Sequence, residues 1–577
     1  MYQQVLDPIG DSLSLTAIFA ALPLLVLFVL LGVLRITAWL AGLLSLLAAI
    51  LVAVLIYPMP VDQAVLAATE GGAFGFFPIL WIVINAIWVY NMTVTTGHFD
   101  VLRRSFARVS DDQRIQAVII AFCFGALLEA LAGFGTPVAI TSVMLIALGF
   151  RPIKAATLAL VANTAPVAFG ALAVPITTLG TVTELPVDDL GAMVGRQTPI
   201  LAIFVPLALV FIVDKGRGVR QVWPAALLCG VTFAIAQFAT SNYLSVPLTD
   251  IVAALIAAGA VVAFLRVWQP ADTYSEELEP EPARTGRTGA ATSTTGRSGA
   301  ASSTTGRTGG GTSDGVDMAK GADADAGKHD PPVEVLRAYS PYLIIIAVFV
   351  VAQIPVVLDA LDSVTVSFNW PGLHILNSAG EASTISTFKF NWLAAAGTLM
   401  VISGLLTIPA LGISPAKALR AYADTYRQLI TAIVTVMAVL ALAYVMNSSG
   451  QTATLGAWMA GAGGWFAIIS PILGWLGVAV TGSDTSSNSL FGALQVKAAM
   501  DAGLNPLLLA AANSSGGVLG KMISPQNLAI AAAAVGLAGK EGDLFRRVLG
   551  WSILFLVLMC ALVYLQSTSV LSWMVPG

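Results

Sequence analysis

The sequence predicts an all-α polytopic membrane protein, and three observations lead to this class. Hydrophobic residues make up 57% of the 577 residues and charged residues only 10%, whereas soluble domains carry about 25% charged residues. Many apolar segments reach the roughly 20 residues that a helix needs to cross a bilayer. Inside lipid every backbone N–H and C=O must be paired, and apolar runs of this length favour helices over barrel strands.

Charge and cysteine content exclude several other classes. The net charge of −4 gives no support for nucleic-acid binding. The three cysteines lie far apart along the chain, which suggests neither a disulfide framework nor a zinc site, and no cofactor is expected. The first apolar segment, residues 13–34, lacks a basic leader and is too long for a signal peptide's apolar core. It is therefore predicted to be a retained span.

A polar segment divides the chain. Residues 269–332 are low in complexity and repeat a ten-residue unit, TGRTGAATST followed by TGRSGAASST. Sequence rich in Gly, Ser and Thr buries too little surface to offset its ordering entropy, so a disordered cytoplasmic linker is predicted; a docking segment is the alternative. Three membrane regions then follow: a first half over 1–215, connecting spans over 216–268, and a second half over 333–577.

Loop charges predict the orientation in the plasma membrane, because Lys and Arg favour the cytoplasmic side. The N-terminus carries Asp7 and Asp11 without a basic residue, and residues 567–577 are uncharged. Both termini are therefore predicted outside, which requires an even number of crossings. The basic loops contain Arg103, Arg104, Arg108 and Arg114; Lys215, Arg217 and Arg220; Lys417, Arg420 and Arg427; and Lys540, Arg546 and Arg547.

Two polar breaks interrupt apolar segments and are predicted to be the tips of re-entrant hairpins. The first hairpin, near 115–150, breaks at GFGTP (133–137) and begins and ends beside basic loops. The second, near 465–500, breaks at TGSDTSSNS (481–489) and lacks a strongly basic loop on either side. It is expected to enter from outside. With both hairpins set aside, about twelve full transmembrane helices satisfy the parity.

The two halves contain an internal repeat. NTAPVAFGALAVP (163–175) and NSSGGVLGKMISP (513–525) share the first Asn, the Gly at the eighth position and the final Pro. GFGT and GSDT precede them at nearly equal distances. These segments predict broken helices near 153–180 and near 506–537. Because the two copies have opposite predicted orientations, they form inverted repeats, a pattern that indicates the binding site of a secondary transporter.

Ionisable residues within spans are expected to be functional, because burying a charge at mid-bilayer costs about 2.5 kcal/mol or more. Glu129 and Asp484 are predicted to couple transport to protons. Lys521 is expected to bind an anionic substrate or to pair with one of these acids, and a lasting structural ion pair is the alternative. Glu70 is interpreted either as functional or as an interfacial acid.

The ends of the half-helices suit a carboxylate. Thr136-Pro137 and Ser524-Pro525 each pair an N-cap residue with a proline at the first helical position, and such ends carry partial positive charge. Ordinary hydrogen bonding between helices is the alternative role for the polar residues nearby. The predicted substrate-binding residues are Thr136, Asn163, Thr164, Ser483, Thr485, Ser486, Asn513, Ser514, Ser515, Lys521, Gln526 and Asn527.

Enzyme motifs are not supported. GGVLGKM resembles a phosphate-binding loop, but Ser515 stands where the first glycine is required and Met522 follows Lys521. The sequence has no HExxH motif. A membrane transporter is therefore favoured over an ATPase or an intramembrane enzyme.

Four segments resemble the motifs of the L-lactate permease family: GALLEALAGFGTPVAI, NTAPVAFGALAVP, TGSDTSSNSLFGALQ and NSSGGVLGKMISPQNLAIA. The resemblance covers nearly the whole chain except the linker. It implies a proton-coupled symporter for lactate and related 2-hydroxy-monocarboxylates such as glycolate, and kinship with transporters that use paired hairpins and elevator-like movement.

The sequence thus predicts a plasma-membrane symporter that imports L-lactate with one or more protons. Its expected partners are the carboxylate substrate, protons and the lipid bilayer, and a homodimer is one option for its assembly. A sodium-coupled carboxylate carrier is the closest alternative, since the same hydroxyl and carbonyl oxygens could ligate Na⁺. An anion channel is another, and a membrane-embedded sensor that signals through the linker is a third.

Overall fold

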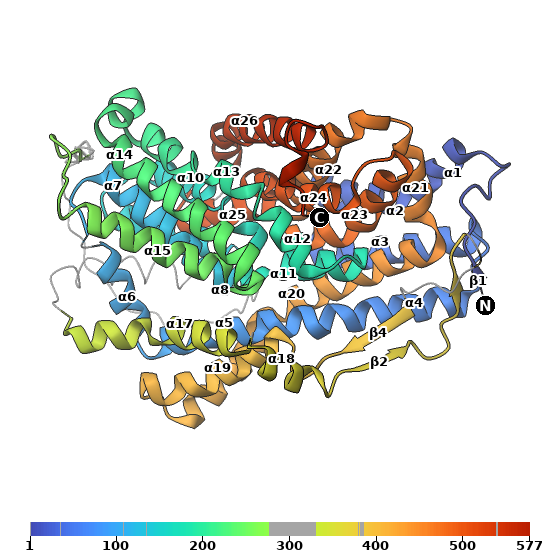
Figure 1. Cartoon of the computed structure of the whole chain (residues 1–577), viewed down its shortest axis with the longest axis horizontal. Helices are drawn as coiled ribbons and strands as arrows, with labels where there is room; N and C mark the ends of the chain where they lie inside the picture. The colour runs from blue at the N-terminus through green and yellow to red at the C-terminus, as the bar shows by residue number, and fades with distance from the viewer. Residues whose placement is uncertain are drawn as a thin grey trace, which may run out of the picture.

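The computed structural model describes residues 2–34, 36–107, 109–133, 135–275, 330–352, 354–378, 380, 386–537 and 540–576. Nearly all regular structure in these residues is helical (Figure 1). Most of the predicted linker, residues 276–329, lies outside the described part of the chain.

The described residues contain ten helical runs that are long and apolar enough to cross a membrane, or eleven if one bent helix pair counts as a span. The chain is therefore a multi-pass membrane protein. The predicted twelve spans differ from this count partly because the run Val187–Tyr243 has 57 residues, whereas about 20 residues cross a bilayer. Its backbone leaves the helical region at Asp214 and Lys215. The twelve-span topology stays a prediction.

Helices from the beginning of each half of the chain pack together as a group that we call the scaffold helices. Helices α3 and α4 pack on α20, and α5 packs on α19, so segments distant in sequence lie side by side (Figure 1). The scaffold helices are α1 Leu13–Ala20, α2 Leu22–Phe28, η1 Val29–Val33, α3 Ala38–Leu55, α4 Val61–Phe74, η2 Gly75–Leu80, α5 Trp81–Thr95, α6 His98–Ala107, α17 Pro332–Ala352, α18 Pro355–Asp362, α19 Ala396–Leu411, α20 Pro415–Ser449 and α21 Gln451–Ala460.

Two small strand pairs accompany the scaffold helices, although no strand is expected from the sequence. Strand β1 (Tyr2–Gln3) pairs in parallel with β3 (Ile375–Leu376). Strand β2 (Val366–Asn369) pairs antiparallel with β4 (Thr387–Phe390), with Val366 opposite Phe390. The pairs lie at one end of the molecule (Figure 1), where β1 ties the N-terminal segment to the second half of the chain.

The remaining helices, which we call the site helices, contain both predicted hairpins and both broken helices. They form a mostly buried cluster in which α22 packs on α24 and α14 on α15. The site helices are α7 Gln113–Gln116, η3 Ala117–Phe124, α8 Gly125–Ala132, α9 Thr136–Ala147, α10 Pro152–Ala162, η4 Val167–Phe169, α11 Gly170–Thr183, α12 Val187–Val194, α13 Thr198–Ala202, α14 Val205–Tyr243, η5 Val246–Leu248, α15 Thr249–Phe264, η7 Gly463–Trp465, α22 Phe466–Thr481, α23 Asp484–Asp501, α24 Pro506–Gly520, η8 Lys521–Ile523, α25 Pro525–Ala534, α26 Glu541–Gln566 and η9 Ser572–Met574.

The helix breaks fall where the sequence predicts them. Helix α8 is followed by α9 across GFGTP, and α22 by α23 within TGSDTSSNS. Helices α10 and α11 form a bent pair with an angle of 66°, and α24 gives way to α25 through the short helix η8. The breaks are therefore structural features. Re-entrant hairpins and inverted repeats are further interpretations of these breaks and stay predictions.

One of the two predicted N-caps is wrong. Ser524 caps α25, since its Oγ accepts a hydrogen bond from the backbone N–H of Asn527 at 3.3 Å. Thr136 is instead the first residue of α9, whose N-cap is Gly135. Gly135 has φ of +85°, a left-handed conformation that glycine adopts without steric cost. The turn is thus completed one residue earlier than expected.

Glycines let α22 and α24 approach closely. A Cβ at Gly474 would overlap the backbone oxygen of Asn513, and one at Gly516 would overlap the backbone oxygen of Pro471. Small residues at such contacts let membrane helices pack backbone to backbone. This packing holds the α22–α23 break against the break between α24 and α25.

Replacing Gly474 with alanine is expected to destabilise the protein, because overpacking a close contact costs about 1–3 kcal/mol. Thermal unfolding of the purified protein in detergent should show a lower midpoint. Gly550→Ala in α26 is the matched control, because a Cβ there meets no atom within 4 Å. Equal unfolding midpoints for the two variants would contradict the close approach.

Candidate functional site

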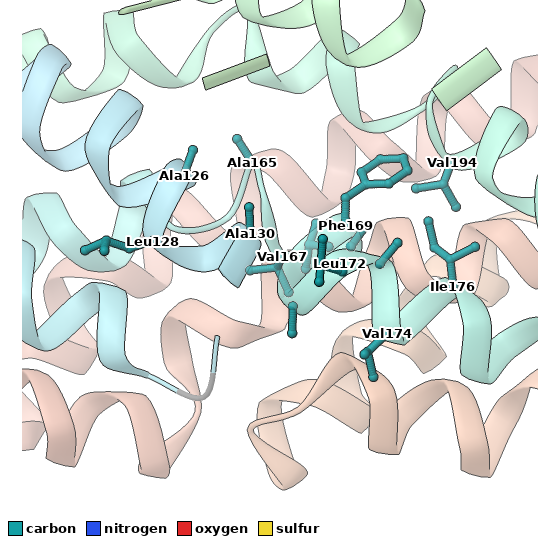
Figure 2. Packing of buried hydrophobic residues seen from close by; sticks show 14 of the residues in the cluster. Ala126, Leu128, Ala130, Ala165, Val167, Phe169, Leu172, Val174, Ile176 and Val194 are labelled. Atoms are coloured by element: carbon teal, nitrogen blue, oxygen red, sulfur yellow. The ribbon is translucent and has the colours of Figure 1, made fainter. Parts of the chain in front are cut away.

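A small cavity of about 60 Å³ lies where the helix breaks meet. A water-sized group needs about 10–15 Å³ on this measure, so the cavity has room for roughly four to six such groups. Small side chains surround the breaks, and Figure 2 shows Ala130 of α8 next to Val167 of η4. The cavity is lined by Glu129, Gly133, Val167, Gly170, Ala171, Val174, Pro175, Gly482, Ser483, Asp484, Thr485, Lys521 and Gln526.

A buried ion pair stands at one side of this cavity. Lys521 Nζ donates to Glu129 Oε1 at 2.6 Å, and the two side chains are 7% and 3% exposed. Asn163 Nδ2 donates to Glu129 Oε2 at 2.8 Å. Glu129 and Lys521 both line the cavity, and Lys521 is the cation among the lining residues.

Asp484 forms the centre of a second polar cluster. Its Oδ2 accepts hydrogen bonds from Ser514 Oγ at 2.5 Å and from Asn488 Nδ2 at 3.4 Å. Its Oδ1 has no hydrogen-bond partner among the described residues. Asn488 also donates to the backbone oxygen of Pro175 at 3.0 Å. This contact joins α23 to the broken α10–α11 pair, so the cluster bridges the two halves of the chain.

Two helix N-termini reach the cavity. The cavity-lining residues Ser483, Asp484 and Thr485 include the N-cap and first turn of α23, and Gln526 lies in the first turn of α25. Ser483 Oγ accepts from the backbone N–H of Ser486 at 3.2 Å. The partial positive charge of these ends adds to that of Lys521 and favours an anion.

The α10–α11 break contains an unusual backbone. Ala171, Leu172 and Ala173 have φ of +44°, +59° and +59°, and Ala171 lines the cavity. Each left-handed residue other than glycine costs roughly 1–2 kcal/mol. Surrounding packing must hold this segment, and such strain is concentrated at functional sites. The sequence contains no glycine at these positions that would have signalled it.

The predicted site residues divide into groups. Ser483, Thr485, Lys521 and Gln526 line the cavity together with the two acids, Glu129 and Asp484. Asn163 and Ser514 hold those acids.

The other predicted residues lie further away. Thr136 and Ser486 face a larger vestibule. Thr164 bonds the backbone oxygen of Val161 at 2.7 Å and lines a different cavity. Asn513 bonds Asn488 and Gln495, and Asn527 bonds the backbone oxygen of Lys521. Ser515 is buried next to Ser514 in α24, and its Oγ has no hydrogen-bond partner among the described residues.

The vestibule has a volume of about 1240 Å³ and shares Ser483 and Gln526 with the small cavity. Its walls come from both helix groups, including Gln428 of α20 and Glu541 of α26. Basic residues of the chain lie near these walls, namely Arg427 beside Gln428 and Lys540 beside Glu541. The vestibule and the small cavity adjoin at Ser483 and Gln526.

Two buried acids lie outside this cavity. Glu70 in α4 is 0% exposed, and neither carboxyl oxygen has a hydrogen-bond partner among the described residues. The carboxyl group of Glu70 is therefore enclosed by protein. Asp250 in α15 is also 0% exposed and is absent from the predicted site. Asp250 is at the start of an apolar run, a position that an exposed acid in the first turn of a helix also occupies. The sequence therefore contains no signal that Asp250 is buried.

A multi-pass helical membrane fold with broken helices around a small charged cavity is typical of membrane transporters. The chain is a member of the L-lactate permease family, whose family model matches residues 16–570. The resemblance noted in the motifs is thereby confirmed.

Several characterised relatives cover the chain from end to end. L-lactate permease of Bacillus subtilis is 41% identical, with 100% of both chains aligned. Glycolate permease GlcA of Escherichia coli is 40% identical over 98% of each chain. Among solved structures, MtrF of Neisseria gonorrhoeae is 14% identical over 96% of this chain and 94% of its own, with a TM-score of 0.44.

Proposed function

We propose that the protein imports L-lactate and related 2-hydroxy-monocarboxylates such as glycolate by proton symport across the plasma membrane. The observation that carries this proposal is buried Lys521 beside a cavity of about 60 Å³. That volume suits a hydroxy acid of two or three carbons. The names of the relatives, L-lactate permease and glycolate permease, support the same substrates.

Substrate binding follows from the charges around the cavity. The carboxylate of the substrate binds Lys521 and the N-termini of α23 and α25. Its 2-hydroxyl forms hydrogen bonds with polar groups of Ser483, Thr485 and Gln526, which line the same cavity. Lys521 is paired with Glu129 in this structure, so an arriving carboxylate competes with Glu129 for the amine.

Proton coupling follows from the same competition. A substrate anion adds one negative charge to a buried site that already contains Glu129 and Asp484. Buried charge without a partner is costly, so a proton accompanies the substrate. Asp484 Oδ1 has no hydrogen-bond partner among the described residues. When the substrate binds Lys521, Glu129 loses part of its ion pair with that residue. Both acids are therefore proposed as proton carriers.

The direction of movement is also part of the proposal. Arg427 and Lys540 are adjacent in sequence to residues that line the vestibule. Because basic residues favour the cytoplasm, we place the vestibule on the cytoplasmic side and infer that this conformation faces inward. Both termini lie outside in this arrangement. The two hairpins then move with the cavity across the scaffold helices in an elevator-like step, and residues 1–215 and 333–577 act as inverted repeats.

Uptake of labelled lactate into proteoliposomes tests the function. We expect an inward proton gradient to accelerate uptake in sodium-free buffer, and we expect unlabelled glycolate to compete. An absolute sodium requirement would support the alternative of a sodium-coupled carrier, whose oxygen ligands would be the same hydroxyls and carbonyls. Sustained current without counterflow would instead indicate an anion channel.

A further inference from the structure

Asp250 is a fully buried carboxyl outside the small cavity. It lies in the first turn of α15 and is 0% exposed. Its Oδ1 accepts a hydrogen bond from Gln237 Nε2 of α14 at 2.9 Å, and Gln237 is also 0% exposed. Neither Asp250 Oδ2 nor Gln237 Oε1 has a hydrogen-bond partner among the described residues.

Gln237 connects this acid to the broken helix of the site. The same Nε2 group donates to the backbone oxygen of Ala165 at 3.3 Å, and Ala165 lies two positions after Asn163, the partner of Glu129. In Figure 2 Ala165 is on the side of the break that faces the green helices of the α14–α15 region. Asp250 is thus connected to this break through Gln237, and Glu129 is connected to it through Asn163.

The charged neighbours of Asp250 are few. Glu129 of α8 is the charged group that acts on it electrostatically. The charged residues of α14 lie at least 17 residues before Gln237, about 25 Å along a helix. Glu334 and Arg337 of α17 pair with each other at 3.0 Å. The titratable groups on the described elements packed against α15 are Glu129, Cys123, Asp214, Lys215, Arg217, Arg220, Cys229, Tyr243, Glu334, Arg337, Tyr339 and Tyr342.

The surroundings of Asp250 favour a protonated carboxyl group. It has a single amide donor, an unpartnered oxygen and another acid as its electrostatic neighbour. An ionised acid buried without a cation is expensive, and a proton on Oδ2 removes that charge. When the substrate competes for Lys521, the negative charge of Glu129 is less well compensated by the amine. The uncompensated charge then disfavours the ionised form of Asp250, so Asp250 binds a proton more readily.

We propose that Asp250, positioned by Gln237, is a second proton-binding site whose proton moves with the substrate. This inference rests on the proposed proton coupling and deepens it, because it assigns one of two transported protons to a group outside the substrate cavity. The other proton is bound inside the cavity by Asp484 or Glu129. The proton on Asp250 never contacts the substrate.

The number of protons moved per lactate tests this assignment. The full-length protein is reconstituted with the membrane potential clamped at zero, and lactate entry and proton entry are measured together with a label and a trapped pH dye. We expect about two protons per lactate for the wild type and about one for Asp250→Asn. With a gradient of about one pH unit, losing one proton lowers steady-state accumulation about tenfold.

Two further arms make the result decisive. Lactate exchange should stay within about twofold of wild type in Asp250→Asn, because the substrate cavity is untouched. Asp188→Asn, an exposed first-turn acid of α12, is the matched control and should keep the wild-type ratio. Gln237→Ala removes the amide donor that favours the ionised carboxylate, and it should move the pH midpoint of uptake upward by at least about half a unit.

The outcomes separate this inference from the function on which it rests. An unchanged proton ratio in Asp250→Asn, or a wild-type ratio of one, overturns the second proton site while symport stands. Loss of exchange together with accumulation also overturns it, because Asp250 is then a structural residue. A wild type that moves lactate without protons overturns the proposed coupling itself.

Discussion

Lys521→Ala is expected to lower lactate uptake by at least about 100-fold, which corresponds to about 2.8 kcal/mol. Lys521 is the cation among the residues that line the cavity, so its removal leaves the substrate carboxylate with helix N-termini alone. The variant also leaves Glu129 buried without its 2.6 Å partner. Initial rates of labelled lactate uptake into proteoliposomes, at equal reconstituted protein, measure the effect.

Loss of folding must be distinguished from loss of binding in this variant. Removing one member of a buried ion pair destabilises a protein by about 3–5 kcal/mol, so the double variant Lys521→Ala, Glu129→Gln is needed. It should recover thermal stability without recovering uptake. Lys497→Ala is the matched control, since its partner Asp501 and its own side chain are 29% and 34% exposed. Wild-type uptake by Lys521→Ala would disprove the site assignment.

The positions of the helix breaks could be predicted from the sequence because their signals are local. A glycine or proline inside an apolar run interrupts a helix wherever the run lies in the fold. Ser524 before Pro525 marked a helix start in this way, and the structure has that cap. The prediction of Thr136 as the N-cap before Pro137 is wrong because Gly135 adopts a left-handed conformation and takes that position. The identities of Thr136 and Pro137 alone do not determine this conformation.

Side-chain partners could be predicted less well, because they depend on contacts distant in sequence. Lys521 and Glu129 are 392 positions apart, and the sequence alone left Lys521 free to pair with either acid. Asn163 and Thr164 are neighbours in the segment NTAPVAFGALAVP. Asn163 nevertheless donates to Glu129, whereas Thr164 donates to the backbone oxygen of Val161. The direction in which each side chain points is set by the broken helix.

Buried acids were hardest to recognise at the ends of apolar runs. Asp250 has the sequence position of a solvent-exposed acid in the first turn of a helix, and only the packing of α14 and α8 against α15 buries it. Glu70 beside Gly71 was interpreted in part as an interfacial acid for the same reason. Gly71 instead packs on the backbone of α20 near Leu440, which seals the acid inside the scaffold helices.

Asp484→Asn is expected to keep lactate exchange within about tenfold of wild type but to lower proton-driven accumulation. Asparagine is neutral and close in shape to the protonated acid, and its side-chain oxygen can still accept the hydrogen bond from Ser514. The loaded site can therefore cross the membrane, whereas a proton can no longer be bound or released at this position. With a gradient of about one pH unit, accumulation should fall at least about tenfold.

Asp501→Asn, at the other end of α23, is the control for a change of acid to amide on the same helix, and it should accumulate lactate normally. The apparent affinity for lactate separates Asp484 from Asp250. Asp484 lines the cavity, so its replacement should change both affinity and proton coupling. Asp250 is not among the residues that line the cavity, so its replacement should change coupling alone. If Asp484→Asn accumulates lactate as the wild type does, the cavity acid carries no proton and Glu129 becomes the remaining candidate inside the site.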